Sequence, residues 1–81
     1  MKLFRSKAER ELDMIISELK QFLENNYKDQ AHLMREKLHI RAVELHDEKK
    51  LPDELFRNYE RLYESFTEDM KNYNHREFYK S

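Results

Sequence analysis

Three histidines in the middle of the sequence are the residues whose types and spacing come closest to a metal site. His32, His39 and His46 recur at seven-residue steps, which on an α-helix puts neighbouring rings about 10 Å apart along one flank. Two histidines that share a zinc ion normally lie one turn apart, so a single metal ion cannot bridge His32, His39 and His46, which form the histidine ladder. Glu36 and His39 have the Glu-x-x-His spacing of carboxylate-bridged di-metal bundles, but such a site needs a second copy of the motif and two further glutamates. We therefore expect no metal site, and keep a metal-binding helical protein that uses these histidines as the second alternative.

Hydroxyl, thiol and carboxyl groups offer little for catalysis. The chain has no cysteine, and no serine stands in an evident arrangement with a base and an orienting acid. Paired acids such as Asp53-Glu54 and Glu68-Asp69 are typical of helix starts and solvated helix faces. A catalytic carboxylate would need a low-dielectric pocket to shift its pKa, and a chain of this length has little room for one. We expect no enzyme, no cofactor and no small-molecule substrate.

Charge and composition limit the kinds of partner. The 16 basic and 17 acidic side chains nearly cancel over 81 residues, so no overall field draws the chain to nucleic acid or an anionic membrane. No apolar run approaches the roughly 20 residues that span a bilayer, and the lack of cysteine fits a reducing compartment. We expect a soluble, cytoplasmic protein. A nucleic-acid-associated accessory protein is the first alternative, because basic and aromatic side chains stand near both ends: Arg5, Lys7, Arg10, Arg76, Phe78, Tyr79 and Lys80.

The elements that must position these groups are helices. With no glycine and one proline, the sequence is typical of helices joined by short links. Ser6 and Glu9 have the spacing of a capping box, in which each side chain accepts a backbone N–H at a helix start. Asn25-Asn26 marks a helix end, since asparagine tolerates the left-handed conformation, and Pro52 suits a first helical turn. The expected bounds are about 6–25 for the first helix, 28–48 for the second and 52–73 for the third, followed by a tail over 74–81.

Apolar residues recur at three- and four-residue steps in each segment, which places them on one stripe of a helix. Helices of about 20 residues with short links predict a single domain over 1–81. The expected fold is an all-α, compact three-helix antiparallel bundle (up-down-up), which self-association would pair into a larger bundle. Beyond Tyr73 the apolar residues no longer follow the helical periodicity, so we expect a frayed extension. The predicted core stripes are Ala8, Leu12, Ile15, Ile16, Leu19, Phe22 and Leu23; Tyr27, Ala31, Met34, Leu38, Ala42 and Leu45; and Leu55, Tyr59, Leu62, Tyr63, Phe66, Met70 and Tyr73.

The second segment carries a further apolar face. Leu33 and Ile40 lie nearly opposite the stripe that contains Leu38, with Val43 beside them. A helix apolar on two faces must bury both or expose one. One explanation is that this helix lies in the middle of the fold, or that the third helix and the tail wrap over this face. The others are that the outer face is an association surface, or that these are scattered apolar residues on the surface. We take Leu33, Ile40 and Val43 as the candidate interaction surface. The expected function is a small protein-interaction or oligomerisation module without catalysis, which binds a protein partner or a second copy of itself.

Overall fold

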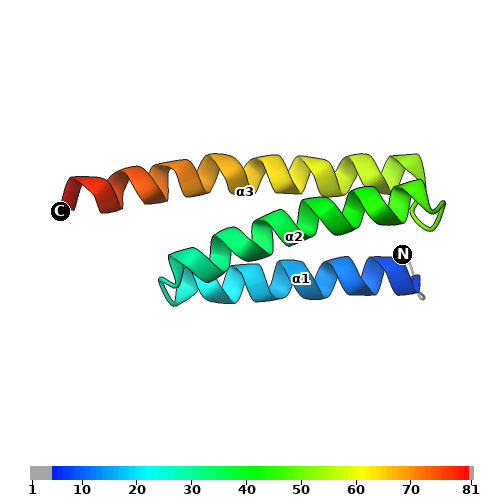
Figure 1. The fold of residues 1–81 in the computed structure, drawn as a ribbon, viewed down its shortest axis with the longest axis horizontal. Helices are drawn as coiled ribbons and strands as arrows, with labels where there is room; N and C mark the ends of the chain where they lie inside the picture. The colour runs from blue at the N-terminus through cyan, green and yellow to red at the C-terminus, as the bar shows by residue number, and fades with distance from the viewer. Residues whose placement is uncertain (1–4, 81) are drawn as a thin grey trace.

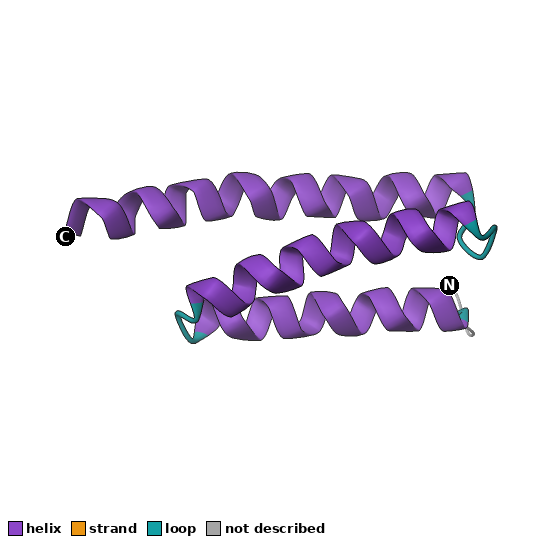
Figure 2. Ribbon diagram, viewed as in Figure 1, coloured by secondary structure: helices purple, strands orange, loops and turns teal. Residues whose placement is uncertain are grey.

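Three helices make up the computed structural model, which describes the backbone of residues 5–80 and the side chains of residues 5–71. They are α1 (Lys7–Glu24), α2 (Lys28–Asp47) and α3 (Asp53–Lys80). Two short loops join them (Figure 2), and the described residues contain no strand. The prediction of an all-α chain is confirmed, and each helix starts within one residue of its expected position.

The start of α1 is fixed by the capping box that the sequence predicts. The Ser6 hydroxyl accepts the backbone N–H of Glu9 at 3.1 Å, and the Glu9 carboxylate accepts the backbone N–H of Ser6 at 2.9 Å. Two donors that no helical carbonyl could reach are thereby satisfied. This exchange also holds the Glu9 side chain against the bundle, where only 3% of the residue is exposed.

The C-terminal ends of α1 and α2 each turn through a residue in the left-handed region, although the chain has no glycine. Asn26 has φ 65° after α1, and Lys49 has φ 64° after α2. After α1 the backbone N–H of Tyr27 donates to the carbonyl of Phe22 at 2.9 Å, and that of Asn26 donates to the carbonyl of Leu23 at 3.2 Å. After α2 the corresponding bonds run from Lys50 to Leu45 and from Lys49 to His46. These bonds define Schellman motifs, which satisfy the last carbonyls of a helix. The asparagine stop was predicted, whereas the lysine stop was not.

Helix α3 is longer than expected and carries helical backbone through the segment predicted as a tail. It has 28 residues and projects beyond the turn between α1 and α2 (Figure 1). Helical hydrogen bonds join backbone groups and need no apolar stripe, and residues 74–80 contain neither glycine nor proline to interrupt them. The longest axis of the molecule, 45 Å, is close to the length of this one helix. The predicted core position of Tyr73 lies outside the described side chains.

The core lies where α2 faces both other helices. Helix α2 packs against α1 and α3, while no Cα atoms of α1 and α3 lie within 8 Å of each other in the described helices. Figure 1 likewise places α2 between the other two. One buried residue, Leu51 at 2% exposure, belongs to the loop before α3 and was not expected in the core. The buried apolar residues are Ala8, Leu12, Ile15, Ile16, Leu19, Ala31, Leu38, Ala42, Leu45, Leu51, Tyr59, Phe66 and Met70.

Two predicted core residues are exposed rather than buried. Tyr27 is 54% exposed because it is the residue that caps α2, and its ring lies beside that of Phe22, with centroids 6.2 Å apart. Leu62 is 41% exposed because it faces the side where α1 and α3 are apart. Periodicity identified the inward side of each helix, but it does not show how closely the neighbouring helix approaches.

Candidate functional site

The outer face of α2, defined as Leu33, Ile40 and Val43, is largely exposed in the part of the chain that the structure describes. Leu33 is 67% exposed and Ile40 is 51% exposed, while Val43 is half-buried. The opposite side of the same helix is fully buried and includes Leu38 at 0% exposure. Of the arrangements that the sequence allowed, burial of both faces is therefore wrong for Leu33 and Ile40. An exposed apolar pair one heptad apart is the feature that an association surface requires.

Charged side chains surround this apolar pair. Between Leu33 and Ile40 lie the adjacent residues Glu36 and Lys37. Glu36 binds the Arg35 guanidinium through one carboxylate oxygen at 2.9 Å, and its side chain is 49% exposed. Lys37 is exposed and makes no ion pair with any residue that the structure describes. The face therefore has one acid and one base on opposite flanks, both accessible from solvent.

An ion pair on the other flank of α2 ties this helix to α1. The Arg41 guanidinium donates two hydrogen bonds to the Glu11 carboxylate, from Nε at 2.5 Å and from Nη2 at 2.9 Å. It also binds Glu44 on its own helix. The hydrogen bonds from Arg41 hold the pKa of Glu11 below its usual range, and they raise the pKa of the guanidinium itself. A bidentate contact fixes geometry as well as charge, so it orients the outer face relative to α1.

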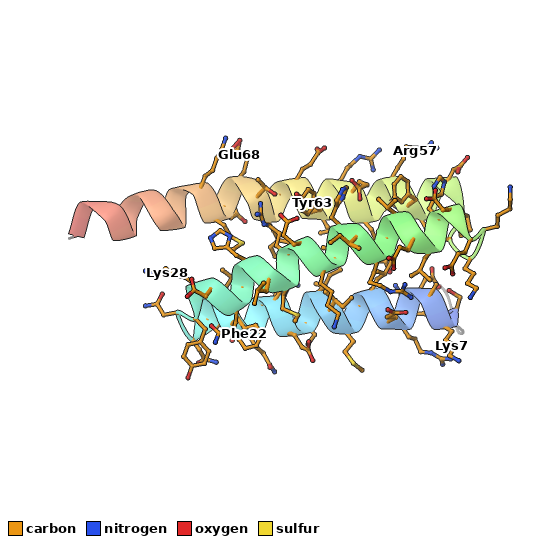
Figure 3. The ribbon with its side chains drawn as sticks, viewed as in Figure 1. Lys7, Phe22, Lys28, Arg57, Tyr63 and Glu68 are labelled. Atoms are coloured by element: carbon orange, nitrogen blue, oxygen red, sulfur yellow. The ribbon has the colours of Figure 1, made fainter. Side chains whose placement is uncertain are left out.

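The histidine ladder lies along the seam between α2 and α3. His39 Nδ1 is 3.0 Å from a carboxylate oxygen of Glu60, and its ring stacks on Tyr63 with centroids 4.7 Å apart. His46 Nε2 is in hydrogen-bond contact with Asp53, and its ring stacks on Phe56 at 4.2 Å. Figure 3 shows the Tyr63 side chain directed from α3 toward α2. Two of the three histidines, His39 and His46, thus bind side chains of α3.

In the described structure, His39 and His46 are hydrogen-bond partners of carboxylates on α3. Hydrogen bonding to His46 lowers the pKa of Asp53, since the carboxylate form accepts that bond. His32, the third histidine of the ladder, is half-buried on the same flank of α2. Within the described residues, no group of three or more histidine, aspartate or glutamate side chains is arranged to hold a metal ion. Glu36 and His39 have the spacing of a metal motif, but Glu36 binds Arg35 and His39 binds Glu60.

A polar cluster joins α1 and α3 on the side where their backbones are apart. The Tyr59 hydroxyl donates to the Asp13 carboxylate at 2.8 Å, and the Arg5 guanidinium lies 3.3 Å from the same hydroxyl and 2.7 Å from Asp13. Burial and the hydrogen bond to Asp13 raise the pKa of Tyr59 to about 12. The cluster forms part of the wall of a groove of about 300 Å³, which also contains Leu55 and Leu62. The sequence placed Tyr59 in the core, and its hydroxyl was the signal that a buried partner was needed.

The described serine and threonine side chains either have structural partners or are exposed on helix surfaces. The Ser6 hydroxyl caps α1, and the Thr67 hydroxyl donates to the Tyr63 carbonyl while accepting from Arg35. Ser17 and Ser65 are exposed on helix surfaces. Ser81 lies outside the described residues.

The basic groups considered for nucleic acid fall into two sets. Near the N-terminus, Lys7 and Arg10 are exposed, but Arg5 is committed to Asp13 and Tyr59. The C-terminal set, Arg76, Phe78, Tyr79 and Lys80, lies outside the described side chains. The structure therefore shows no basic stripe among the residues whose side chains it describes.

Comparisons with known proteins leave the site to be interpreted from its own geometry. No protein-family model matches the sequence, and no curated protein and no solved structure is significantly similar to it. Among the described residues, none of the helices combines the length and the apolar character that crossing a lipid bilayer demands. The outer face of α2 is consequently the candidate site on physical grounds alone.

Proposed function

We propose that the protein is an antiparallel, up-down-up three-helix bundle that works as a protein-interaction module, with the outer face of α2 as its contact surface. It acts by binding rather than by catalysis. The observation that carries this proposal is the exposure of Leu33 and Ile40, at 67% and 51%, on a helix whose other side is completely buried. In support of the antiparallel order, the α1–α2 turn and the α2–α3 turn lie at opposite ends of the bundle in Figure 1.

Folding does not require apolar residues on this face. The buried stripe of α2 already supplies its contacts to both neighbours, and it includes Ala31, Leu38 and Ala42, each at 0% exposure. Leu33 and Ile40 add little to the stability of the single chain while their side chains stand in water. Burying an aliphatic side chain of this size contributes about 1.5–3 kcal/mol. A partner that covers both would gain from contacts that the folded chain leaves unused.

The two alternatives gain no comparable support. A metal site would have to recruit histidines that already bind Glu60 and Asp53 on α3. In its N-terminal set, a nucleic-acid surface would have to rely on Lys7 and Arg10 without Arg5, which binds Asp13. Among the residues whose side chains are described, neither alternative rests on a group that converges on a common ligand.

The test compares charge substitutions of two exposed apolar residues. Ile40→Glu places a carboxylate on the outer face, and Met14→Glu places one on α1, where Met14 is 65% exposed and away from this face. We expect Ile40→Glu to weaken association at least about tenfold, since it removes about 1 kcal/mol of apolar burial from a half-exposed side chain and places a charge that a partner would desolvate. Met14→Glu should leave association unchanged.

Two readouts are needed for this comparison. Light scattering behind a sizing column gives the molar mass over about a hundredfold range of concentration, and far-ultraviolet circular dichroism reports the helices. Both variants should keep the helical spectrum and the melting temperature of the parent chain. Loss of helix in Ile40→Glu would show that Ile40 stabilises the single chain. Equal association of the two variants would overturn the outer face as the contact surface.

A further inference from the structure

The charged residues that border the outer face of α2 are mainly acids. At about 100° per residue, Asp29 and Asp47 point in nearly the same direction as Ile40. Glu36 and Glu44 lie on either side of that direction, and all four acidic residues are exposed. We call these four residues the acidic rim, because they lie at both ends and on both sides of the exposed apolar pair.

Bases in the body of α2 point toward the neighbouring helices instead. Arg35 donates to the Thr67 hydroxyl on α3 at 3.0 Å. Lys37 lies on the α1 side, where the hydrogen bonds from Arg41 and, to a smaller extent, the charge of Lys37 lower the pKa of Glu11. The outer face therefore carries net negative charge, although acids and bases nearly cancel over the whole chain.

The carboxylates of the acidic rim are available to a partner. Asp29 and Asp47 make no ion pair with any residue in the described part of the chain. Glu36 and Glu44 each bind one arginine of α2 through a single oxygen, and their side chains are 49% and 51% exposed. Because an ionised carboxylate has about four acceptor positions, each of these two glutamates can accept hydrogen bonds from a further base.

Helix stability accounts for only one acid of the rim. Asp29 lies in the first turn of α2, where the positive end of the helix dipole favours an acid. Glu44 and Asp47 lie in the last turn, where the negative end of the dipole disfavours them. A residue that lowers the stability of its own helix, beside exposed apolar side chains, is typical of a binding surface.

We infer that the occupant of this face is a helix of a different protein, with an apolar stripe bordered on both sides by lysine or arginine. This inference rests on the proposed function and specifies the chemistry of its partner. Leu33 and Ile40 are about 10 Å apart along the helix axis, so apolar residues seven positions apart on the partner helix reach both. The bases beside that stripe then lie opposite the acidic rim, which makes the two surfaces complementary in charge.

A second copy of the chain matches this face less well. In an antiparallel twofold pair, each flank of one helix faces the same flank of the other, so a pair centred on the middle of α2 sets Glu36 beside its own copy. In a parallel twofold pair, residues of equal number meet near the centre line, so Asp29 faces Asp29 and Asp47 faces Asp47. Like charges brought together in this way weaken association.

The size of the face sets the expected strength of binding. Helix α2 has 20 residues and so is about 30 Å long and about 10 Å wide, which gives a contact of roughly 300 Å² on this chain. Stable complexes usually bury about 800 Å² per partner. We therefore expect a dissociation constant of about 10–100 µM for a single basic helix.

The test uses two synthetic helical peptides of about 20 residues, which match the length of α2. Both have leucine along one stripe, bordered by lysine in one peptide and by glutamate in the other. Fluorescence anisotropy of the labelled peptide, titrated with the full chain, gives the dissociation constants. At about 0.05 M salt the lysine peptide should bind at least about tenfold more tightly, and the difference should shrink at about 0.5 M salt, where exposed charges are screened. Equal binding of the two peptides overturns the inference.

Two charge reversals show where the lysine peptide binds. Glu36→Lys and Glu68→Lys change the net charge equally, and each removes a carboxylate paired with a base of its own helix. Figure 3 shows Glu68 on the side of α3 that points away from α2. Glu36→Lys should weaken binding about fivefold, and Glu68→Lys should change it less than about twofold. Equal effects would mean that the peptide responds only to overall charge, which overturns the inference.

The apolar part of the contact is tested without a change of charge. Ile40→Gln should weaken binding of the lysine peptide at least about threefold, whereas Met14→Gln on α1 should leave it unchanged. Far-ultraviolet circular dichroism checks that both variants stay helical, and Leu33→Gln replaces Ile40→Gln if that variant loses helix. Unchanged binding in the folded variant of the outer face overturns the inference.

The results separate this inference from the proposed function. Self-association of the parent chain that Ile40→Glu abolishes and Met14→Glu preserves would place a second copy on the outer face. That result overturns the inference and leaves the proposed function standing. Ile40→Gln that weakens both peptides equally, with no preference for lysine, has the same meaning. A lysine peptide that does not bind at up to about 1 mM overturns the inference, and the proposed function then depends on the comparison of Ile40→Glu with Met14→Glu.

Discussion

Tyr59→Phe is the substitution that isolates the contact between α1 and α3. The tyrosine ring is buried at 5% exposure and would keep its packing, while its hydroxyl loses the 2.8 Å bond to Asp13 and the 3.3 Å contact with Arg5. Asp13 and Arg5 remain paired at 2.7 Å, so neither is left as an isolated charge. A hydrogen bond of this kind contributes about 1 kcal/mol net, which is about a fivefold change in the unfolding equilibrium constant.

The pH dependence of this contact follows from its pKa. Because the pKa of Tyr59 is raised to about 12 in the folded chain, above the value of about 10 for an ordinary tyrosine, its contribution to stability is fully present below about pH 10. It is lost as the pH rises toward 12, since the unfolded chain then releases a proton that the folded chain retains. Tyr59→Phe should therefore flatten the fall in stability in this alkaline range.

The assay is thermal and urea unfolding followed by circular dichroism at pH 7 and at several pH values between 9 and 11. Tyr63→Phe is the matched control, because it removes the same atom and the Tyr63 hydroxyl makes no hydrogen bond within the described residues. We expect Tyr59→Phe to lower the melting temperature by about 4–8 °C at pH 7 and to leave association unchanged, since Tyr59 is remote from the outer face of α2. A loss of stability equal in the two variants, or an alkaline fall that persists in Tyr59→Phe, would refute the role assigned to the Tyr59–Asp13 bond.

Two further substitutions test the core and the seam between α2 and α3. Leu38→Ala removes a side chain with 0% exposure and should lower the free energy of unfolding by about 2–5 kcal/mol. That loss approaches the whole stability of a chain this small. A melting temperature within a few degrees of the parent would place Leu38 outside the core. Asp53→Asn tests the contact with His46. The pKa of Asp53 is lowered in the folded chain, so its contribution is present above about pH 4 and is lost as the pH falls through the folded value. The melting temperatures of Asp53→Asn and the parent should therefore differ at pH 6 and converge toward pH 2, and a difference that does not change with pH would contradict the contact.

Most of the helical layout was predictable because its causes are local in the sequence. Ser6 and Glu9 stand three residues apart, so the capping box that starts α1 requires no knowledge of the rest of the chain. The apolar stripe through Leu38 is set by helical periodicity alone. The exposure of Leu33 and Ile40 could not be decided in this way, because it depends on which other helices cover α2.

The parts that sequence reasoning missed depend on contacts between helices. Lys49 takes a left-handed conformation that glycine or asparagine would normally adopt, because the loop must return Leu51 to the core. The histidine ladder gave no hint that His39 and His46 would bind carboxylates of α3, since that requires knowing which flank of α2 faces α3. Spacing along one helix predicts a face, and only the position of its neighbour gives that face a partner.

The pattern of contacts between the helices affects how quickly the chain folds. Helix α2 contacts α1 and α3, each its neighbour in sequence, while α1 and α3 make no close backbone contact in the described helices. Each hairpin of helices can thus form by closing a short loop, and proteins dominated by such local contacts fold in microseconds to milliseconds. The hydrogen bond between Tyr59 and Asp13 joins residues 46 apart, so we expect it to form after the folding transition state and to govern the rate of unfolding.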